Sequence, residues 1–124
     1  MIDFKNGKAI KLSPADNPNN VQTIMPLLVN GEQVIAQFSA IRDFVIFTNK
    51  RIITVNVQGM TGKKKDFTSL PYSKIQAFSI ETSGTFDLDA ELELSFSGLG
   101  SVKLEFSRSA EIHTIGRMIS EHVL

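Results

Sequence analysis

Residues 88–97 read LDAELELSFS, and their alternation of apolar and polar side chains is the clearest structural signal in the chain. Apolar residues take every second position from Leu88 to Phe96, and acidic or hydroxyl side chains take the positions between them. A period of two indicates a strand with one face on a core, and no helical period fits these residues. After the turn GLGS, the alternating Val102, Leu104 and Phe106 predict an antiparallel partner strand.

Working outward, the same period begins at residue 34, and residues 44–47 (FVIF) form a continuous apolar run. Residues 51–57 and two segments between residues 67 and 80 predict further strands. Helical spacing favours a short helix over 19–29, interrupted at Pro26, and an amphipathic helix over 109–124 with Ser109 as its N-cap. We therefore expect a mainly β fold of about seven antiparallel strands, a bent sheet or two packed sheets, with the last helix closing one end.

Length and composition narrow the function class. The 124 residues predict one domain over 21–124, preceded by a polar arm over 1–20. Thirteen basic residues balance thirteen acidic ones, which argues against a nucleic-acid partner. There is no cysteine, and no stretch has the length and apolarity of a signal peptide or a membrane span. These features predict a soluble, cytoplasmic protein.

Four blocks in a fixed order carry a resemblance to a known family. RDFVIFTNKR (42–51), QGMTGKK (58–64), LPYSKI (70–75) and ETSGTFDLDAELEL (81–94) resemble the bacterial pleckstrin-homology (PH) family, over about residue 28 to the C-terminus. The resemblance implies a bent barrel of seven antiparallel strands in two nearly orthogonal sheets with a C-terminal capping helix. It also implies a non-catalytic protein without a cofactor that forms ring-like homo-oligomers. Lipid-binding relatives place Lys and Arg in the loop between the first two strands. In that loop this chain has only Arg42, which Asp43 follows.

The lysine run in GMTGKKKD is a candidate anion-binding site. A nucleotide-binding P-loop needs Gly, four residues and then Gly-Lys-Ser/Thr before a helix, and this run fails on spacing, hydroxyl and context. A solvated hairpin tip is one interpretation. The alternative is contact with an anionic membrane surface or phosphate headgroup, to which each lysine adds about 1 kcal/mol. The residues of this alternative site are Lys63, Lys64 and Lys65.

Catalytic and metal sites are not expected. The two histidines of the last helix, His113 and His122, lie on opposite sides of it and cannot share a metal. The single tyrosine, Tyr72, is expected at the edge of the core with its hydroxyl hydrogen-bonded. No nucleophile, base and orienting group stand together in a recognisable motif.

Two features point to self-association or a protein partner. Both faces of the FVIF strand are apolar, so the face away from the core needs a helix or a second chain to cover it. The carboxylates at every second residue from 87 to 93 predict an acidic row, whose repulsion Lys103 could relieve and which a basic surface of another copy could meet. The predicted interface residues are Phe44, Ile46, Lys50 and Arg51 on one side and Asp87, Asp89 and Glu91 on the other.

Overall fold

A computed structural model of the chain describes residues 1, 10–82, 89–107 and 110–124. Within these residues, eight strands form one hydrogen-bonded sheet in the order β5-β4-β3-β2-β1-β8-β7-β6. The strands are β1 (Ile10–Pro14), β2 (Val34–Ser39), β3 (Phe44–Thr48), β4 (Arg51–Gln58), β5 (Lys64–Pro71), β6 (Ile75–Glu81), β7 (Ala90–Phe96) and β8 (Gly100–Phe106). The helices are α1 (Pro18–Ile24) and α2 (Ile112–Val123), and the 3-10 turns are η1 (Met25–Leu27) and η2 (Tyr72–Lys74).

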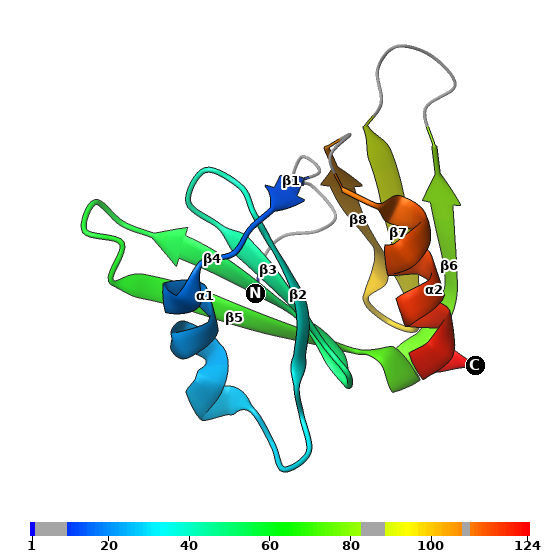
Figure 1. Cartoon of the computed structure of the whole chain (residues 1–124), viewed down its shortest axis with the longest axis horizontal. Coiled ribbons are helices and arrows are strands. Elements are labelled where there is room, and N and C mark those ends of the chain that lie inside the picture. The colour runs from blue at the N-terminus through cyan, green and yellow to red at the C-terminus, as the bar shows by residue number, and fades with distance from the viewer. Residues whose placement is uncertain (2–9, 83–88, 108–109) are drawn as a thin grey trace.

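The sheet bends into two halves, β2–β5 and β6–β8, whose strands run in very different directions (Figure 1). The seven expected strands are β2 to β8, and all neighbours within each half are antiparallel. The helix α2 lies against β6 to β8 on the concave side (Figure 1). The prediction of a mainly β fold with a C-terminal helix is confirmed.

The strand β1 joins the two halves and adds an eighth strand. Its end pairs antiparallel with β2, where Ser13 faces Ser39. Its beginning pairs parallel with β8, where Leu12 faces Phe106. Residues 10–14, which the sequence analysis assigned to a polar arm, therefore form part of the sheet, because the backbone groups of both neighbouring strands provide partners for this short segment.

The main core lies between the two halves and α2. Phe38 of β2 packs edge-on against Phe47 and Phe106, with ring centroids 5.5 and 5.0 Å apart. Edge-to-face aromatic contacts at these separations add to the stabilisation that burial provides. The apolar stripe of α2 enters the same core through Ile112, Ile115 and Ile119, as the helical spacing predicted.

A second apolar cluster lies on the opposite face of β3 and β4. The side chain of Ile24 from α1 is fully buried there against Phe44, Ile46, Ile53 and Val55. The two predicted interface residues of β3, Phe44 and Ile46, are thus covered within the same chain, and neither offers a surface to a second one. This corrects the interface prediction, because α1 covers most of the second apolar face.

The helix α1 begins and ends for local reasons. The Asn17 side chain accepts a hydrogen bond from the Asn19 N–H at 2.9 Å and caps the start of α1. The α-helical part stops at Ile24, just before the turn that contains Pro26. Glu111 is the N-cap residue of α2, and the predicted cap, Ser109, lies outside the described residues. Among the described residues, no helix is long and apolar enough to cross a bilayer.

Candidate functional site

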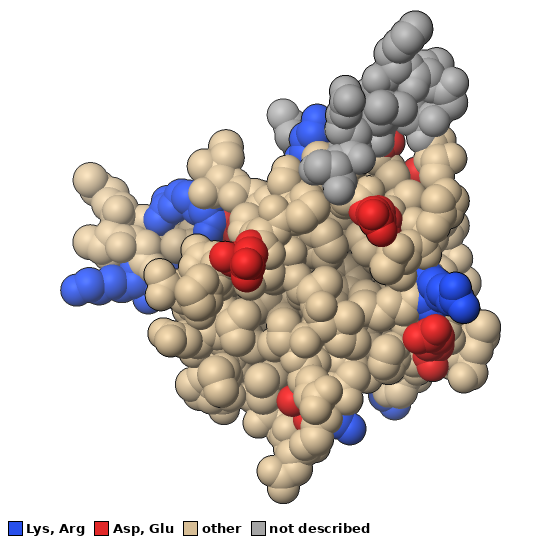
Figure 2. All heavy atoms as spheres, viewed as in Figure 1, with Lys and Arg blue, Asp and Glu red and all other residues tan. Residues whose placement is uncertain are grey.

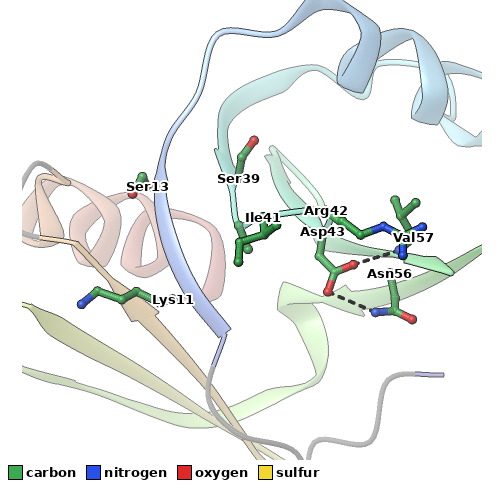
Figure 3. A pocket seen from close by; sticks show the side chains of 9 residues that line it. Lys11, Ser13, Ser39, Ile41, Arg42, Asp43, Asn56 and Val57 are labelled. Carbon is green, nitrogen blue, oxygen red and sulfur yellow. Dashed lines mark hydrogen bonds between the residues drawn. The ribbon is translucent and has the colours of Figure 1, made fainter. Parts of the chain in front are cut away.

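Two connections meet at one end of the β2–β5 half: the β2–β3 loop (residues 40–43) and the β4–β5 turn (residues 59–63). We call them together the loop end. The carboxylate of Asp43 accepts hydrogen bonds from the Val57 N–H at 2.9 Å and from the Asn56 amide at 3.1 Å (Figure 3). The Arg42 guanidinium donates to the Gly59 carbonyl. These bonds hold the two connections against each other.

The β4–β5 turn has a backbone that needs glycine. Gly59 and Gly62 have φ angles of 78° and 68°, which side chains disfavour, and the Gly62 N–H donates to the Gly59 carbonyl at 3.3 Å. Lys63 lies in the turn, and the strand β5 begins at Lys64. Successive side chains of a strand point to opposite faces, so Lys64 and Lys65 do not converge on one pocket.

The predicted anion-binding lysines therefore form a basic rim, not a closed phosphate cradle. Lys63, Lys64 and Lys65 are all exposed, and no ion pair of the described residues includes any of them. Figure 2 shows Lys and Arg side chains gathered at the side of the molecule where the β4–β5 turn projects. The next carboxylate, Asp66, binds the Met1 amino group at 2.6 Å, and that hydrogen bond lowers the pKa of Asp66.

Two large apolar side chains extend from the loop end into water. Ile41 of the β2–β3 loop is 102% exposed and Met60 of the β4–β5 turn is 104% exposed. The sequence analysis did not single out either residue. The sequence did carry a signal, because each expected turn contains one large apolar residue. That signal is weak, since single exposed apolar residues are common on protein surfaces. The hydrogen bonds that join the two connections place both residues at the same end of the β2–β5 half.

Beside the loop end lies an open cavity of about 880 Å³. Its volume falls within the range of small-molecule sites. Its polar lining comes from the hydroxyls of Ser13 and Ser39, from Asn56 and Asp43, and from Lys11 and Arg42, as Figure 3 shows. The Lys11 ammonium is engaged with Asp89 at 2.6 Å. The cavity therefore offers mixed donors and acceptors with part of its charge already neutralised.

Arg51, another predicted interface residue, holds parts of its own chain together. Its guanidinium contacts the carboxylate of Glu32 at 2.9 Å. It also donates to the Leu27 carbonyl at 2.6 Å and to the Ser69 hydroxyl at 3.0 Å. Arg51 thereby ties η1 and β5 to β4. Its neighbour Lys50 is exposed in the β3–β4 turn.

Glu32 is a buried carboxylate with a full set of partners. Besides Arg51, it accepts hydrogen bonds from the Thr48 hydroxyl at 2.7 Å and from the Val29 N–H at 3.1 Å. Burial alone would raise the pKa of Glu32, but these hydrogen bonds outweigh it and hold the pKa below the ordinary 4.5. Glu32 therefore carries a negative charge that depends on Arg51.

Around this ion pair, part of the apolar surface of the α1 side is left uncovered. We call it the α1-face patch. Arg51 reaches the Leu27 carbonyl on one side and Ser69 on the other, and Phe67 lies two residues before Ser69 on the same face of β5. The patch consists of Met25, Leu27, Val29 and Phe67, whose exposed fractions lie between 40% and 57%.

The acidic row lies on the outward face of β6 to β8. Glu91 faces Glu81 of β6 on one side and Glu105 of β8 on the other, so like charges stand directly opposite each other. The ammonium of Lys103 is 3.9 Å from Glu91, and Lys103 stands opposite Glu93, which is the position that the predicted relief of repulsion requires. Of the other predicted members, Asp89 is paired with Lys11, and Asp87 lies outside the described residues.

The residues that most resemble catalytic groups are engaged in the fold. The Tyr72 hydroxyl donates to the Thr48 carbonyl at 2.7 Å, which confirms the predicted satisfied hydroxyl. Burial and the nearby Glu32 carboxylate raise the pKa of Tyr72, which makes it a poor acid. His122 lies over its ring at 5.4 Å and its Nδ1 is 2.7 Å from the Met118 carbonyl. Among the described residues, no group of three His, Asp or Glu could hold a metal ion.

Comparisons with known proteins give one family. The model of the bacterial PH domain matches residues 3–123. An uncharacterized protein of Bacillus subtilis, YjqA, is 42% identical over 121 residues, which are 96% of this chain and 94% of YjqA. A crystal structure of a DUF1696 family protein with a pleckstrin-homology domain from Shewanella loihica has 35% identity and a TM-score of 0.81, and the match covers 94% of this chain and 100% of that one. A pleckstrin homology domain from Shewanella amazonensis has 36% identity and a TM-score of 0.68, with 95% and 94% covered.

Proposed function

We propose that this chain, which belongs to the bacterial PH domain family, acts by assembling with copies of itself and not by catalysis. The observation that carries the proposal is the α1-face patch. The helix α1 has only seven residues, and the apolar residues left exposed on this side belong to the segment that follows it and to β5: Met25, Leu27, Val29 and Phe67. Exposed apolar residues that cluster, and are rimmed by polar groups, are typical of protein–protein contact sites. A second copy would remove this surface from water.

Charge favours a head-to-tail contact. Lys50 lines the same 490 Å³ cleft as Val29 of the α1-face patch, so a lysine lies at the edge of the patch. The acidic face of β6 to β8 lies on the other half of the sheet and has two like-charged cross-strand contacts around Glu91. Lys50 of one copy placed against the acidic face of the next would relieve that repulsion and would set the relative orientation of the two copies. Contacts between different surfaces of identical chains close into rings when the rotation allows it.

Light scattering after size exclusion tests the assembly. The wild-type chain should have a mass several times 13.7 kDa, stable over about a tenfold range of concentration. Val29→Glu should shift it toward 13.7 kDa, because the new carboxylate would be buried in the contact. Ile41→Glu is the matched control, since that residue is also exposed but lies at the loop end. A wild-type mass of 13.7 kDa at every concentration would refute the proposal.

A second candidate function is favoured by the cations of the loop end. The bond from Arg42 to the Gly59 carbonyl brings a fourth cation beside Lys63, Lys64 and Lys65. A local set of four cations can bind an anionic surface even when the whole chain is neutral. Each cation near such a surface contributes about 1 kcal/mol at low salt, and copies in one assembly add their contributions.

Flotation with phosphatidylglycerol vesicles tests this candidate. The wild-type chain should float with the vesicles at low salt and lose binding as salt is added. Replacing Lys63, Lys64 and Lys65 with alanine should weaken binding on the order of a hundredfold, since three contributions of about 1 kcal/mol are lost. A control that removes as many cations elsewhere should keep binding: Lys74, Lys103 and Arg117 to alanine. Equal losses in both variants would exclude the loop end as the binding site.

A further inference from the structure

The strand β2 pairs along only half of the edge that faces away from β3. The pairing with β1 is confined to the end of β2, where Pro14 stands opposite Phe38 and the Ala15 N–H donates to the Gln37 carbonyl at 3.1 Å. The chain then leaves the sheet toward α1, which begins at Pro18. Among the described residues, no strand pairs with the first half of β2 on this side, so that part of the edge can accept an added strand.

The open part of the edge presents backbone hydrogen-bonding groups. Just before β2, the Gln33 N–H donates to the side-chain oxygen of Asn49 at 2.8 Å, and the Gln33 carbonyl accepts from the Asn49 N–H at 3.1 Å. Both groups of Gln33 therefore face the side of β3. Because backbone groups alternate along a strand, those of the next residue, Val34, face the open side. Val34 thus offers one donor and one acceptor to an extended partner.

A groove of about 430 Å³ lies between this edge and α2. Its helix side is formed by Ile115 and Met118, which are three residues apart and so lie on one face of α2. Its sheet side is formed by Pro14, Ile35, Ala36 and Phe38. The side chain of Ile35 is 45% exposed, which leaves apolar surface for a partner to cover. The groove therefore combines an open strand edge with apolar walls.

The groove has a single charge. Among the described residues that line it, only Glu111 is charged, and this residue is the N-cap residue at the start of α2. Glu111 is exposed, its carboxylate accepts a hydrogen bond from the Thr114 hydroxyl at 3.2 Å, and it takes part in no ion pair of the described residues. A partner with a cation beside this end of the helix would be complementary to it.

We infer that this groove binds an extended peptide segment of another protein, which adds a strand to the open edge of β2. The segment carries apolar side chains at every second position and a lysine or arginine at the end that meets Glu111. In strand addition, main-chain hydrogen bonds supply affinity and pockets for alternate side chains supply specificity. An acyl chain would fill the apolar walls but leave the backbone groups of Val34 without partners.

Random heptapeptides displayed on phage and selected on the full chain provide the probe. The enriched sequences should alternate apolar and polar side chains and carry a basic residue at one end. A synthetic peptide of the most enriched sequence should then bind the chain in fluorescence anisotropy. Selection that enriches no alternating sequence would overturn the inference, and binding of dodecanoate without any such peptide would assign the groove to an acyl chain.

Methylation of the peptide backbone tests whether it binds as a strand. Methyl groups on the nitrogens that face β2 remove hydrogen bonds to the edge and collide with it, so binding should weaken about tenfold or more. Methyl groups on the intervening nitrogens should change it by less than about twofold, because those N–H groups face away from β2. Equal losses with the two methylated peptides would overturn strand addition.

Substitutions on α2 locate the site. Thr114→Arg places a long cationic side chain in the groove and should weaken binding about tenfold, because it fills the space and repels the basic end of the peptide. His113→Arg is the matched control, since this exposed neighbour on the same helix does not line the groove. Glu111→Gln should weaken binding about threefold, and only for peptides that carry the basic residue. Equal binding by the two arginine variants would place the peptide elsewhere.

Light scattering separates this inference from the proposed assembly. Thr114→Arg should leave the mass of the wild type unchanged, because the groove lies on the side of the main core and the α1-face patch lies on the opposite face of β3 and β4. A lower mass for this variant would mean that a second copy occupies the groove, and the inference would be overturned.

Discussion

The outer faces of the two halves of the sheet differ in their exposure: one is covered by α1, and the other is open to water. Behind β3 and β4, apolar side chains are buried under Ile24 of α1, and the buried pair of Glu32 and Arg51 holds η1 in place. Behind β7 and β8, Glu91 and its neighbours stay in water, with Lys103 as an exposed partner at 3.9 Å. The comparison teaches that an ion pair of the same chemistry can be essential on one face and nearly neutral on the other, because desolvation makes an unpaired buried charge costly.

Removing Arg51 should have the largest effect. Arg51→Ala leaves the fully buried Glu32 carboxylate without its cation and removes the bonds to Leu27 and Ser69. We expect a loss of about 3–5 kcal/mol in the free energy of unfolding. Urea unfolding followed by circular dichroism measures it. If the loss were below about 1 kcal/mol, the pair would behave like the exposed pair on the other face, and the comparison would fail.

Truncating the covering side chain of α1 comes next. Ile24→Ala creates a cavity against Phe44 and Ile53 and should cost about 2–4 kcal/mol. Thermal unfolding measures the change. Val21→Ala, one turn earlier on the same helix and only half-buried, is the control and should cost less than half as much. Equal costs at the two positions would mean that α1 covers the sheet loosely.

The charge on Glu32 predicts a dependence on pH. The pKa of Glu32 is lower in the folded chain than its ordinary 4.5. The ionised carboxylate therefore stabilises the fold above about pH 5, and this stabilisation is lost as the pH falls through the pKa of the folded state. Glu32→Gln should cost about 1–3 kcal/mol at pH 7, and the difference from wild type should shrink as the pH falls below 4.5. Unfolding curves from pH 7 to pH 3 measure it. A difference that stays constant over that range would contradict the lowered pKa.

The smallest effect should come from the acidic face. Glu91→Gln removes the contact with Lys103 but also the repulsion from Glu81 and Glu105, so stability should change by less than about 0.5 kcal/mol in either direction. Its effect on assembly should be larger than its effect on folding. The charge swap sharpens the test: Lys50→Glu and Glu91→Lys should each lower the mass in light scattering, and the double variant should restore it. An unchanged mass in all three variants would exclude the acidic face from the proposed contact.

Much of the sheet could be predicted because its strands carry their own periodicity. The residues of β7 and β8 alternate in the sequence just as they alternate in burial, and the stripe of α2 shows the same agreement. The strand β1 could not be predicted in this way. Its sequence, IKLSP, alternates only over four residues before Pro14, which is too short to predict a strand, and it is a strand because β2 and β8 lie on either side of it. Pairing with distant segments decides such a strand, not local propensity.

The candidate sites were less accessible to sequence reasoning. The run FVIF correctly indicated that the second face of β3 needs a cover, but the period says nothing of whether α1 or another chain supplies it. Arg51 looked like a free surface cation because its partner, Glu32, is 19 residues away in the sequence. Ile41 and Met60 were missed because neither belongs to a pattern by itself.

By itself, the sequence determined the mainly β character, the antiparallel strands from β2 to β8, the closing helix α2 and the run of lysines in a glycine turn. Each of these depends on the spacing of residues that are close in the chain. The tertiary structure alone decided that β1 joins the two halves, that α1 covers β3, that Arg51 pairs with Glu32, and that Ile41 and Met60 lie at the same end of the sheet as the lysines. These features depend on contacts between segments far apart in the sequence, and only the folded backbone determines which of them meet.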